Sequence, residues 1–163
     1  MITYKNGDLL KSNCDIICHQ VNLQGIFGGG LALQIYKKFP CVEKNLQKAL
    51  LKDRSIKTKK RFDLEFCGFQ NKNGCMPQYI ANIFSQDKDY NTRYDWLDTA
   101  IENLLKHIET IEHIIPFKKI GFPYGYGCGI ANGKWEEVEK VLKKHFENNT
   151  KYDCEIWVYK KEN

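Results

Sequence analysis

The sequence predicts a three-layer α/β/α fold, in which helices cover both faces of a central, largely parallel or mixed sheet. Three observations lead to this prediction. Segments with the pattern of strands alternate with segments of helical period along the 163 residues. The sequence contains no internal repeat, low-complexity tract or linker. Two glycine-rich segments follow expected strands, at the place where open α/β sheets bind ligands.

Two strands and then two helices are expected in the first 52 residues. Residues 1–4 predict a short strand and residues 15–21 a buried one, because apolar and β-branched residues dominate both. A helix is expected over residues 30–39 and ends at Pro40, which cannot continue it. A second helix is expected over residues 42–52.

A strand pair and a long helix are expected next. Residues 61–69 alternate with period two, residues 71–74 offer turn chemistry, and residues 79–84 return as a strand. Residues 94–108 place apolar side chains at helical spacing, which predicts an amphipathic helix.

The last third of the chain predicts strand, helix and strand. Residues 119–122 are short and apolar, so an interior strand is expected there. Residues 133–146 carry an apolar helical face, and residues 154–159 predict the closing strand.

Composition and length favour one domain over residues 1–163, with 42% hydrophobic and 13% aromatic residues to build a core. No apolar run reaches the roughly 18 residues of a membrane span, and the first residues lack a signal-peptide pattern. We therefore expect no membrane association, a cytoplasmic location and a monomer.

The seven cysteines predict neither a disulfide framework nor a zinc ribbon, because their number is odd and no Cys-x-x-Cys pair occurs. Cys14, Cys18 and His19 raise the alternative of a metal site. Two of them alternate along an expected strand without a second ligand cluster, so no metal is expected.

Positive charge is concentrated between residues 36 and 60, in a chain of net charge +5. This stretch has nine basic and two acidic residues. One interpretation is a solvated helix face and loop. Others are steering of an anionic ligand, or weak nucleic-acid contact. Aromatic residues do not interleave with the stretch as a base-stacking platform requires.

The glycine-rich segments 25–30 and 125–129 predict anion binding. Glycine lets backbone N–H groups approach phosphate oxygens, and a helix that starts just after the loop adds its dipole. Two such loops at one end of a sheet suit a pyrophosphate held from both sides. The alternative is that the glycines only make tight turns. Neither the Walker A nor the G-x-G-x-x-G pattern is present.

Three segments of the chain, together with one tryptophan, resemble the macrodomain family in order and spacing. They are Ile2-Thr-Tyr-Lys-Asn-Gly-Asp-Leu-Leu, Asp15-Ile-Ile-Cys-His-Gln-Val-Asn-Leu-Gln-Gly-Ile-Phe-Gly-Gly-Gly-Leu-Ala, Pro123-Tyr-Gly-Tyr-Gly-Cys-Gly-Ile, and Trp135. The resemblance spans nearly the whole chain. It is greatest to the branch with the terminal ADP-ribose protein glycohydrolase and the ADP-ribose 1''-phosphate phosphatases. It implies an α/β/α macrodomain with a central mixed sheet that binds ADP-ribose or a related nucleotide without a cofactor.

The resemblance also implies roles for individual residues. Asp8, followed by Leu9, matches the aspartate that accepts a hydrogen bond from the adenine amine, although an Asp after Gly could equally cap a turn. Asn22 matches an asparagine near the distal ribose. Phe27 and Tyr126 are expected to pack on the ribose or to cover the rim of the core. The residues that match the two loops around the ribose and phosphates are Gly28, Gly29, Gly30 and Leu31, and Gly125, Tyr126, Gly127, Cys128 and Gly129.

Catalytic residues of the related hydrolases are missing. One branch has an aspartate where this chain has Ala32. The glycohydrolase branch has a nucleophilic lysine at the position of Ser85 or Gln86, and an aspartate at that of Ala131. A neighbouring amide cannot replace a lysine nucleophile. Asp87 and Lys88 offer a substitute, but such residues in a polar loop are usually solvated.

His19 and Asn22 remain as the catalytic candidates. The phosphatase branch has a histidine at the position of His19, where an imidazole could protonate a leaving oxygen or activate water. Alternatively, His19 is a half-buried strand residue that orients the loop of Asn22.

Two main functional hypotheses follow. The first is a hydrolase of ADP-ribose 1''-phosphate or of an ADP-ribosyl adduct, with ADP-ribosylated protein or nucleic acid as further candidate partners. The second is a non-enzymatic sensor of ADP-ribose or another NAD-derived nucleotide. An RNA-binding role for the basic stretch is a third, weaker reading, which salt-sensitive binding would support.

Overall fold

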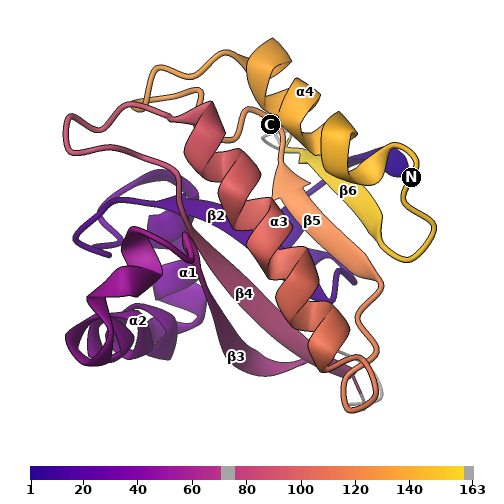
Figure 1. Cartoon of the computed structure of the whole chain (residues 1–163), viewed down its shortest axis with the longest axis horizontal. Coiled ribbons are helices and arrows are strands. Elements are labelled where there is room, and N and C mark those ends of the chain that lie inside the picture. The colour runs from indigo at the N-terminus through magenta and orange to yellow at the C-terminus, as the bar shows by residue number, and fades with distance from the viewer. Residues whose placement is uncertain (71–75, 160–163) are drawn as a thin grey trace.

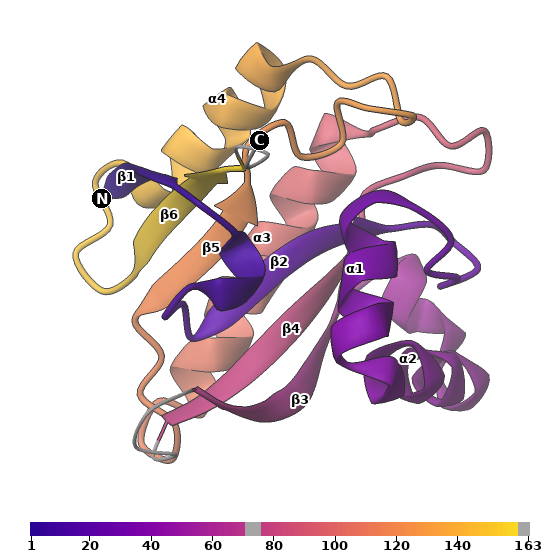
Figure 2. The same ribbon diagram turned by 180° about the vertical axis from the view of Figure 1, so that it is seen from behind.

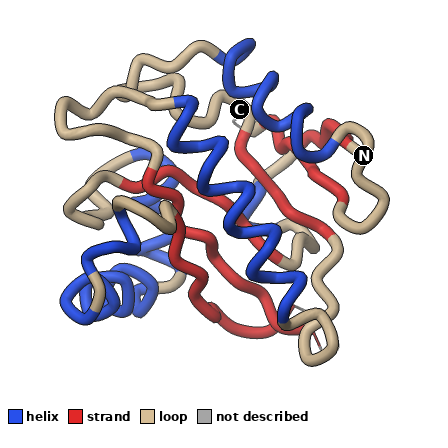
Figure 3. The backbone as a smooth tube through the Cα atoms, in the orientation of Figure 1, coloured by secondary structure: helices blue, strands red, loops and turns tan. Residues whose placement is uncertain are grey.

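A mixed six-stranded sheet runs through the molecule, in the order β1-β6-β5-β2-β4-β3 (Figures 1 and 3). The computed structural model describes residues 1–70 and 76–159. Neighbouring strands are parallel except for β3 and β4, which are antiparallel. The strands are β1 Ile2–Asn6, β2 Ile16–Val21, β3 Phe62–Gln70, β4 Met76–Phe84, β5 Lys119–Pro123 and β6 Asp153–Val158.

Helices cover both faces of the sheet, so the predicted three-layer α/β/α fold is confirmed. Helices α3 (Tyr94–Thr110) and α4 (Trp135–Phe146) cover the face toward the viewer in Figure 1. Helices α1 (Gly30–Lys38) and α2 (Pro40–Lys52) cover the opposite face, which Figure 2 shows. Two short 3₁₀ helices, η1 (Leu9–Lys11) and η2 (Arg54–Lys57), were not expected from the sequence.

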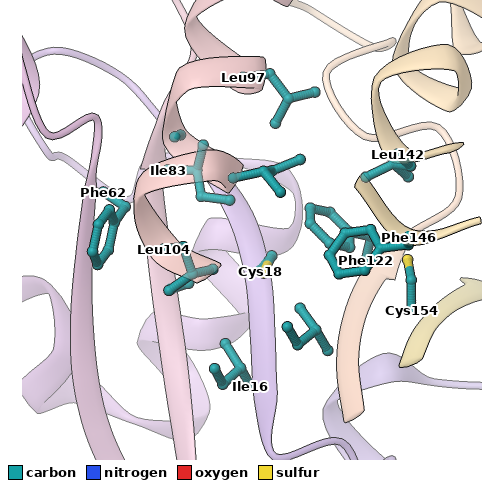
Figure 4. Packing of buried hydrophobic residues seen from close by; sticks show 14 of the residues in the cluster. Ile16, Cys18, Phe62, Ile83, Leu97, Leu104, Phe122, Leu142, Phe146 and Cys154 are labelled. Atoms are coloured by element: carbon teal, nitrogen blue, oxygen red, sulfur yellow. The ribbon is translucent and has the colours of Figure 1, made fainter. Parts of the chain in front are cut away.

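The period-two pattern of β2 divides the core into two clusters. Ile16 and Cys18 point into the cluster under α3 and α4, together with Phe122 and Phe146 (Figure 4). Ile17 and Val21 point into the cluster under α1 and α2. A strand that is buried on both faces reads as a continuous apolar run, which is the signal that residues 15–21 carry.

Every strand and α-helix expected from the sequence is present, with boundaries that differ from the expected ones by at most three residues. Pro40 begins α2, because the first turn of a helix needs no N–H from its first residue. Helix α4 starts at Trp135, two residues later than residue 133, because the backbone of Lys134 is extended, with φ −104° and ψ 126°. Gly133 N–H donates to the Gly127 carbonyl at 2.8 Å, and Lys134 N–H to Tyr94 Oη at 2.9 Å. The predicted turn at 71–74 lies outside the described residues.

Strands β2 and β5 are parallel neighbours in the centre of the sheet. Their carboxyl ends therefore lie at the same end of the sheet. The first glycine-rich segment follows β2 and the second follows β5, so the two segments, far apart in sequence, come together here. This is the position expected for a ligand site in an open α/β sheet.

Candidate ligand-binding and active site

A cavity of about 580 Å³ opens at the carboxyl ends of β2 and β5. The end of β2, the two glycine-rich segments and the loop after β4 form its wall. Its lining residues are 19–22, 26, 28–32, 86, 90, 123–127 and 129–131. No Asp, Glu, Lys or Arg in the described part of the chain lines it. An anionic ligand would therefore depend on backbone N–H groups and neutral side chains.

The first glycine-rich loop presents backbone to this cavity. Helix α1 begins at Gly30, which has the left-handed φ of +57°. The first helical hydrogen bond runs from Leu33 N–H to the Gly29 carbonyl, so the N–H groups before Leu33 have no acceptor within the helix. A Cβ atom at Gly28 or Gly29 would meet no atom within 4 Å. Packing therefore does not require glycine at these two positions, and the space beside their backbone is open.

Helix α2 holds this loop in place. Glu43 accepts a hydrogen bond from Phe27 N–H at 2.6 Å. Gln47 donates to the carbonyls of Gln24 and Gly25, each at 2.7 Å. These contacts fix the backbone direction of the loop before any ligand binds, which lowers the cost of binding.

The second loop is shaped by glycines of two kinds. A Cβ atom at Gly127 would lie 2.6 Å from Thr92 Oγ1, so packing and its φ of +68° both require glycine. A Cβ atom at Gly125 or Gly129 would meet no atom within 4 Å, as at Gly28 in the first loop, but Gly125 has a left-handed φ of +78° that favours glycine. Because α4 starts only at Trp135 and does not line the cavity, the expected helix N-terminus at this loop is absent. Among the described helices, α1 alone brings its first residues to the cavity.

A buried polar network, which the sequence interpretation missed, ties the second loop to the loop after β4. Gln20 Nε2 lies 3.1 Å from both Ser85 Oγ and Thr92 Oγ1. Thr92 Oγ1 donates to the Gly127 carbonyl at 2.7 Å, and Ser85 Oγ lies 2.6 Å from Tyr126 Oη. A glutamine within a buried strand is the sequence signal that indicates such a network, because a buried amide needs partners.

His19 lines the cavity but is buried, with only 1% of its surface exposed. Its Nε2 lies 2.6 Å from Asn82 Oδ1, and its ring packs edge-on against Phe27 with 5.0 Å between centroids. Burial lowers its pKa to about 4, although the bond to Asn82 opposes the shift. The imidazole is therefore neutral at pH 7, and Nδ1 has no hydrogen-bond partner among the described residues.

Asn22 also lines the cavity, and its side chain shapes the first loop. Its Nδ2 donates to the Ile26 carbonyl at 2.9 Å, while its Oδ1 accepts from Ile26 N–H at 3.0 Å. One N–H and one lone pair of the amide remain for other partners.

Four of the predicted site residues do not line the cavity. Asp8 caps η1, because its Oδ1 accepts from Leu10 N–H at 2.9 Å; this is the turn-capping alternative. The Leu9 side chain lies in the core under α1 and α2. Phe27 is 3% exposed in the same core, beneath the loop. Cys128 is partly buried and packs against the core under α3 and α4, and its Sγ donates to the Tyr126 carbonyl at 3.2 Å.

Tyr126 lines the cavity with little exposed surface. Its ring is 2% exposed and lies edge-on to Phe122. Of the two expectations for Tyr126 and Phe27, the covering of the core therefore agrees with the structure. A loop gives no alternating pattern from which the inward direction of such rings can be read.

The positions at which the sequence resemblance implies catalytic residues lie at the cavity or directly beside it. Ala32, Gln86 and Ala131 line the cavity, whereas Ser85 is fully buried beside it. Asp87 binds the N–H groups of Asp89 and Asn91 and so forms a local turn. Lys88 is exposed and does not line the cavity. The geometry thus gives no support to Asp87 and Lys88 as substitutes.

Exposed apolar side chains surround the mouth of the cavity and were not predicted. Ile26 is 57% exposed, Tyr90 49%, Tyr124 50% and Ile130 86%, and all four line the cavity. Loop positions without periodicity carry no sequence signal for such a rim. The rim offers apolar and aromatic surface to whatever is attached to a ligand in the cavity.

The described residues form neither a metal-binding cluster nor a membrane-spanning helix. Within residues 1–70 and 76–159, no group of three or more His, Cys, Asp or Glu side chains is placed to bind a metal ion. Cys18 and His19 point to opposite faces of β2. None of the helices in the described ranges is sufficiently long and apolar to span a membrane.

Comparisons with known proteins agree on the fold. No family model matches the chain. An ADP-ribose 1''-phosphate phosphatase of Scheffersomyces stipitis is 29% identical over 98% of this chain and 99% of its own length. A DNA ADP-ribosyl glycohydrolase of Mycobacterium tuberculosis is 26% identical over 96% of this chain, which spans 42% of that relative.

Solved structures are similar over almost the whole chain. The macrodomain of Mycobacterium tuberculosis DarG has a TM-score of 0.77 and 24% identity, covering 96% of this chain and 97% of that one. The macrodomain of Thermus aquaticus DarG has a TM-score of 0.74 and 24% identity, covering 99% of both chains. The chain therefore has the macrodomain fold, and its sequence is similar to those of an ADP-ribose 1''-phosphate phosphatase and a DNA ADP-ribosyl glycohydrolase.

Proposed function

We propose that this macrodomain binds ADP-ribose in the cavity and hydrolyses an ADP-ribose derivative, either ADP-ribose 1''-phosphate or an ADP-ribosyl adduct on protein or nucleic acid. The observation that carries the proposal is the pair of glycine loops on one cavity whose lining has no charged side chain. Backbone N–H groups of two loops suit the two phosphates of a pyrophosphate. The names of the two kinds of relative support the same chemistry.

We place the adenine near Asp8 and the distal ribose near Asn22. Asp8 uses Oδ1 for the cap of η1, and a carboxylate has further acceptor sites for the adenine amine. Leu9 would contribute through its backbone, because its side chain is buried. Asn22 keeps one donor and one acceptor for ribose hydroxyls after closing its own loop.

We assign the proton transfer, or the orientation of the attacking water, to His19 and its neighbours. If Nε2–H donates to Asn82, Nδ1 is the basic nitrogen of the imidazole, and its lone pair has no hydrogen-bond partner among the described residues. A pKa of about 4 makes it a weak base at pH 7, and a bound phosphate would raise that pKa through its negative charge. Because no lysine stands at positions 85 and 86, the reaction would depend on positioning and on charge stabilisation by the loops.

Further parts of the proposal concern the state of the protein. We propose a single domain over residues 1–163, supported by the pairing of β1 near the start with β6 near the end. We also propose a monomer in the cytoplasm, where thiols such as Cys14 and Cys41 stay reduced.

The test is incubation of the purified chain with ADP-ribose 1''-phosphate and, separately, with ADP-ribosylated protein and DNA. Release of phosphate or of free ADP-ribose is the expected result, and His19→Ala should reduce turnover by about two to four orders of magnitude. Gly28→Ala serves as the binding-deficient control. Tight ADP-ribose binding without turnover of any substrate would refute the hydrolase and leave a protein that only binds ADP-ribose.

A further inference from the structure

His19 is paired with a second buried polar side chain, that of Asn82. The two residues stand opposite each other on the parallel strands β2 and β4. His19 is 1% exposed and Asn82 is fully buried, and 2.6 Å separates His19 Nε2 from Asn82 Oδ1. His19 lines the cavity, whereas Asn82 does not. The amide of Asn82 therefore reaches a ligand in the cavity only through the imidazole.

The surroundings of this pair are apolar. The neighbours on the same face of the two strands lie in the core under α1 and α2 and are Ile17, Val21, Ile80 and Phe84. One polar atom of each side chain is used in the mutual bond, and the other, His19 Nδ1 or Asn82 Nδ2, has no hydrogen-bond partner among the described residues. A buried polar atom without a partner lowers stability, and replacing both side chains by apolar ones removes that cost. Folding alone therefore does not account for the pair.

The bond to Asn82 determines which nitrogen of the imidazole carries the proton. Asn82 Oδ1 can only accept a hydrogen bond, so Nε2 donates, and the lone pair of the neutral imidazole then lies on Nδ1. Burial lowers the pKa of His19 to about 4, so the ring is neutral at pH 7. A carboxylate in place of the amide would stabilise the imidazolium instead. An amide thus suits an imidazole that acts as a neutral base.

Two contacts fix the plane of the imidazole ring. The torsion between Cβ and an imidazole has broad minima, so the neighbours of the ring must orient it. Asn82 holds Nε2 from β4, and Phe27 lies edge-on against the ring, with 5.0 Å between centroids and 83° between planes. The imidazole is therefore held in one orientation before a substrate binds, as a general base oriented by a further group requires.

We propose that Asn82 is a positioning residue for the reaction at this cavity: it holds His19 as the Nε2–H tautomer and leaves Nδ1 as the basic nitrogen. Nδ1 accepts a proton from the attacking water and gives one to the leaving group, so the imidazole ends neutral, as it began. Asn82 accepts from Nε2–H throughout and does not touch the substrate. The inference rests on the proposed function, because it names the residue that prepares His19 for the proton transfer.

The tautomer is measured in the protein without ligand, from long-range proton–nitrogen correlation spectra of isotope-labelled histidine. The chain has four histidines, and His19→Ala identifies the signals of His19. At pH 7 the wild type should show the Nε2–H form alone. Asn82→Asp keeps the acceptor, so the proton should stay on Nε2 and the pKa of His19 should rise, whereas Asn82→Leu should allow the Nδ1–H form. Asn103→Leu, which removes the bonds of another asparagine to the carbonyls of Lys59 and Lys60, is the matched control and should leave His19 unchanged.

Kinetic measurements on the same variants show whether the bond serves the reaction. Asn82→Leu should lower kcat by about 10- to 100-fold, the scale on which orienting partners of histidines act in metal sites, and leave KM and the affinity for ADP-ribose near the wild-type values. In a His19→Ala background it should lower kcat no further, because the two residues act as one unit. A further loss in that background, or an equal loss of ADP-ribose affinity, would assign Asn82 to the fold alone.

Asn82→Asp provides the same test if Asn82→Leu does not fold, because it preserves the shape of the side chain. The acid limb of its kcat profile should move to higher pH with the raised pKa of His19, and an unmoved limb would contradict the role of Asn82. An Nδ1–H tautomer in a wild type that turns over its substrate would overturn the inference and leave the hydrolase intact. A wild type that turns over no substrate would refute the hydrolase, and with it the role of Asn82, whichever tautomer is present.

Discussion

The substitution Gly28→Ala tests whether Gly28 is needed for folding or for ligand binding. The added Cβ atom would meet no atom of the protein within 4 Å, and Gly28 does not have a left-handed φ. Stability should therefore be unchanged or rise by up to about 1 kcal/mol, because alanine restricts the unfolded chain. If the methyl group displaces a phosphate from two N–H groups, binding should weaken by about 2–4 kcal/mol, or about 30- to 1,000-fold in Kd.

Thermal unfolding and calorimetry with ADP-ribose measure the two effects on the same samples. Gly129→Ala is the matched variant in the second loop, since its Cβ atom also meets nothing within 4 Å. Gly127→Ala is the opposite control: its clash with Thr92 and its left-handed φ should lower the melting temperature. Wild-type affinity in Gly28→Ala would refute the assignment of the first loop to the phosphates.

Three further predictions concern titratable groups. Asp8→Asn keeps an acceptor for the cap of η1, so the stability of the fold should not change. Calorimetry should show weaker binding of ADP-ribose and unchanged binding of ribose 5-phosphate. Equal losses of affinity for both ligands would mean that Asp8 only shapes the loop. Burial lowers the pKa of His19 from 6.5 to about 4, so the unfolded chain binds the proton first as the pH falls. The free energy of unfolding should then decrease between pH 6.5 and 4, by about 3 kcal/mol at most, and urea titrations of His19→Gln should lack this decrease. Burial, with the hydrogen bond and charge of Asp63, raises the pKa of Glu65 from 4.5 to about 8. The folded chain keeps that proton longer, so stability should fall as the pH rises from 4.5 to 8; Glu65→Gln should remove the fall, and an unchanged pH profile would contradict the assignment.

Periodicity and turn chemistry predict the elements of this fold because they are local properties. The apolar run of β2, the amphipathic α3 and the glycine triplet before α1 each depend on neighbouring residues alone. Both glycine-rich loops were expected to follow strands, and the parallel pairing of β2 with β5 in the structure places them at one end of the sheet.

Contacts between distant segments could not be predicted in this way. The burial of His19 depends on Phe27 and Asn82, which approach it from a loop and from β4. The meeting of Arg61 and Trp96 depends on how η2 and α3 pack. The inward direction of Cys128 is set by a loop without periodicity.

The most direct test of the central claim is a titration of isotope-labelled protein with ADP-ribose, followed through the backbone amide resonances. The largest shifts should occur at the amides of residues 28–31 and 125–129 and should saturate at micromolar ligand, which corresponds to a binding free energy of about −8 kcal/mol. The amides of Arg61 and Trp96, which do not line the cavity, should shift little. An absence of shifts at millimolar ADP-ribose, or shifts confined to residues outside the two glycine loops, would contradict the assignment of this cavity.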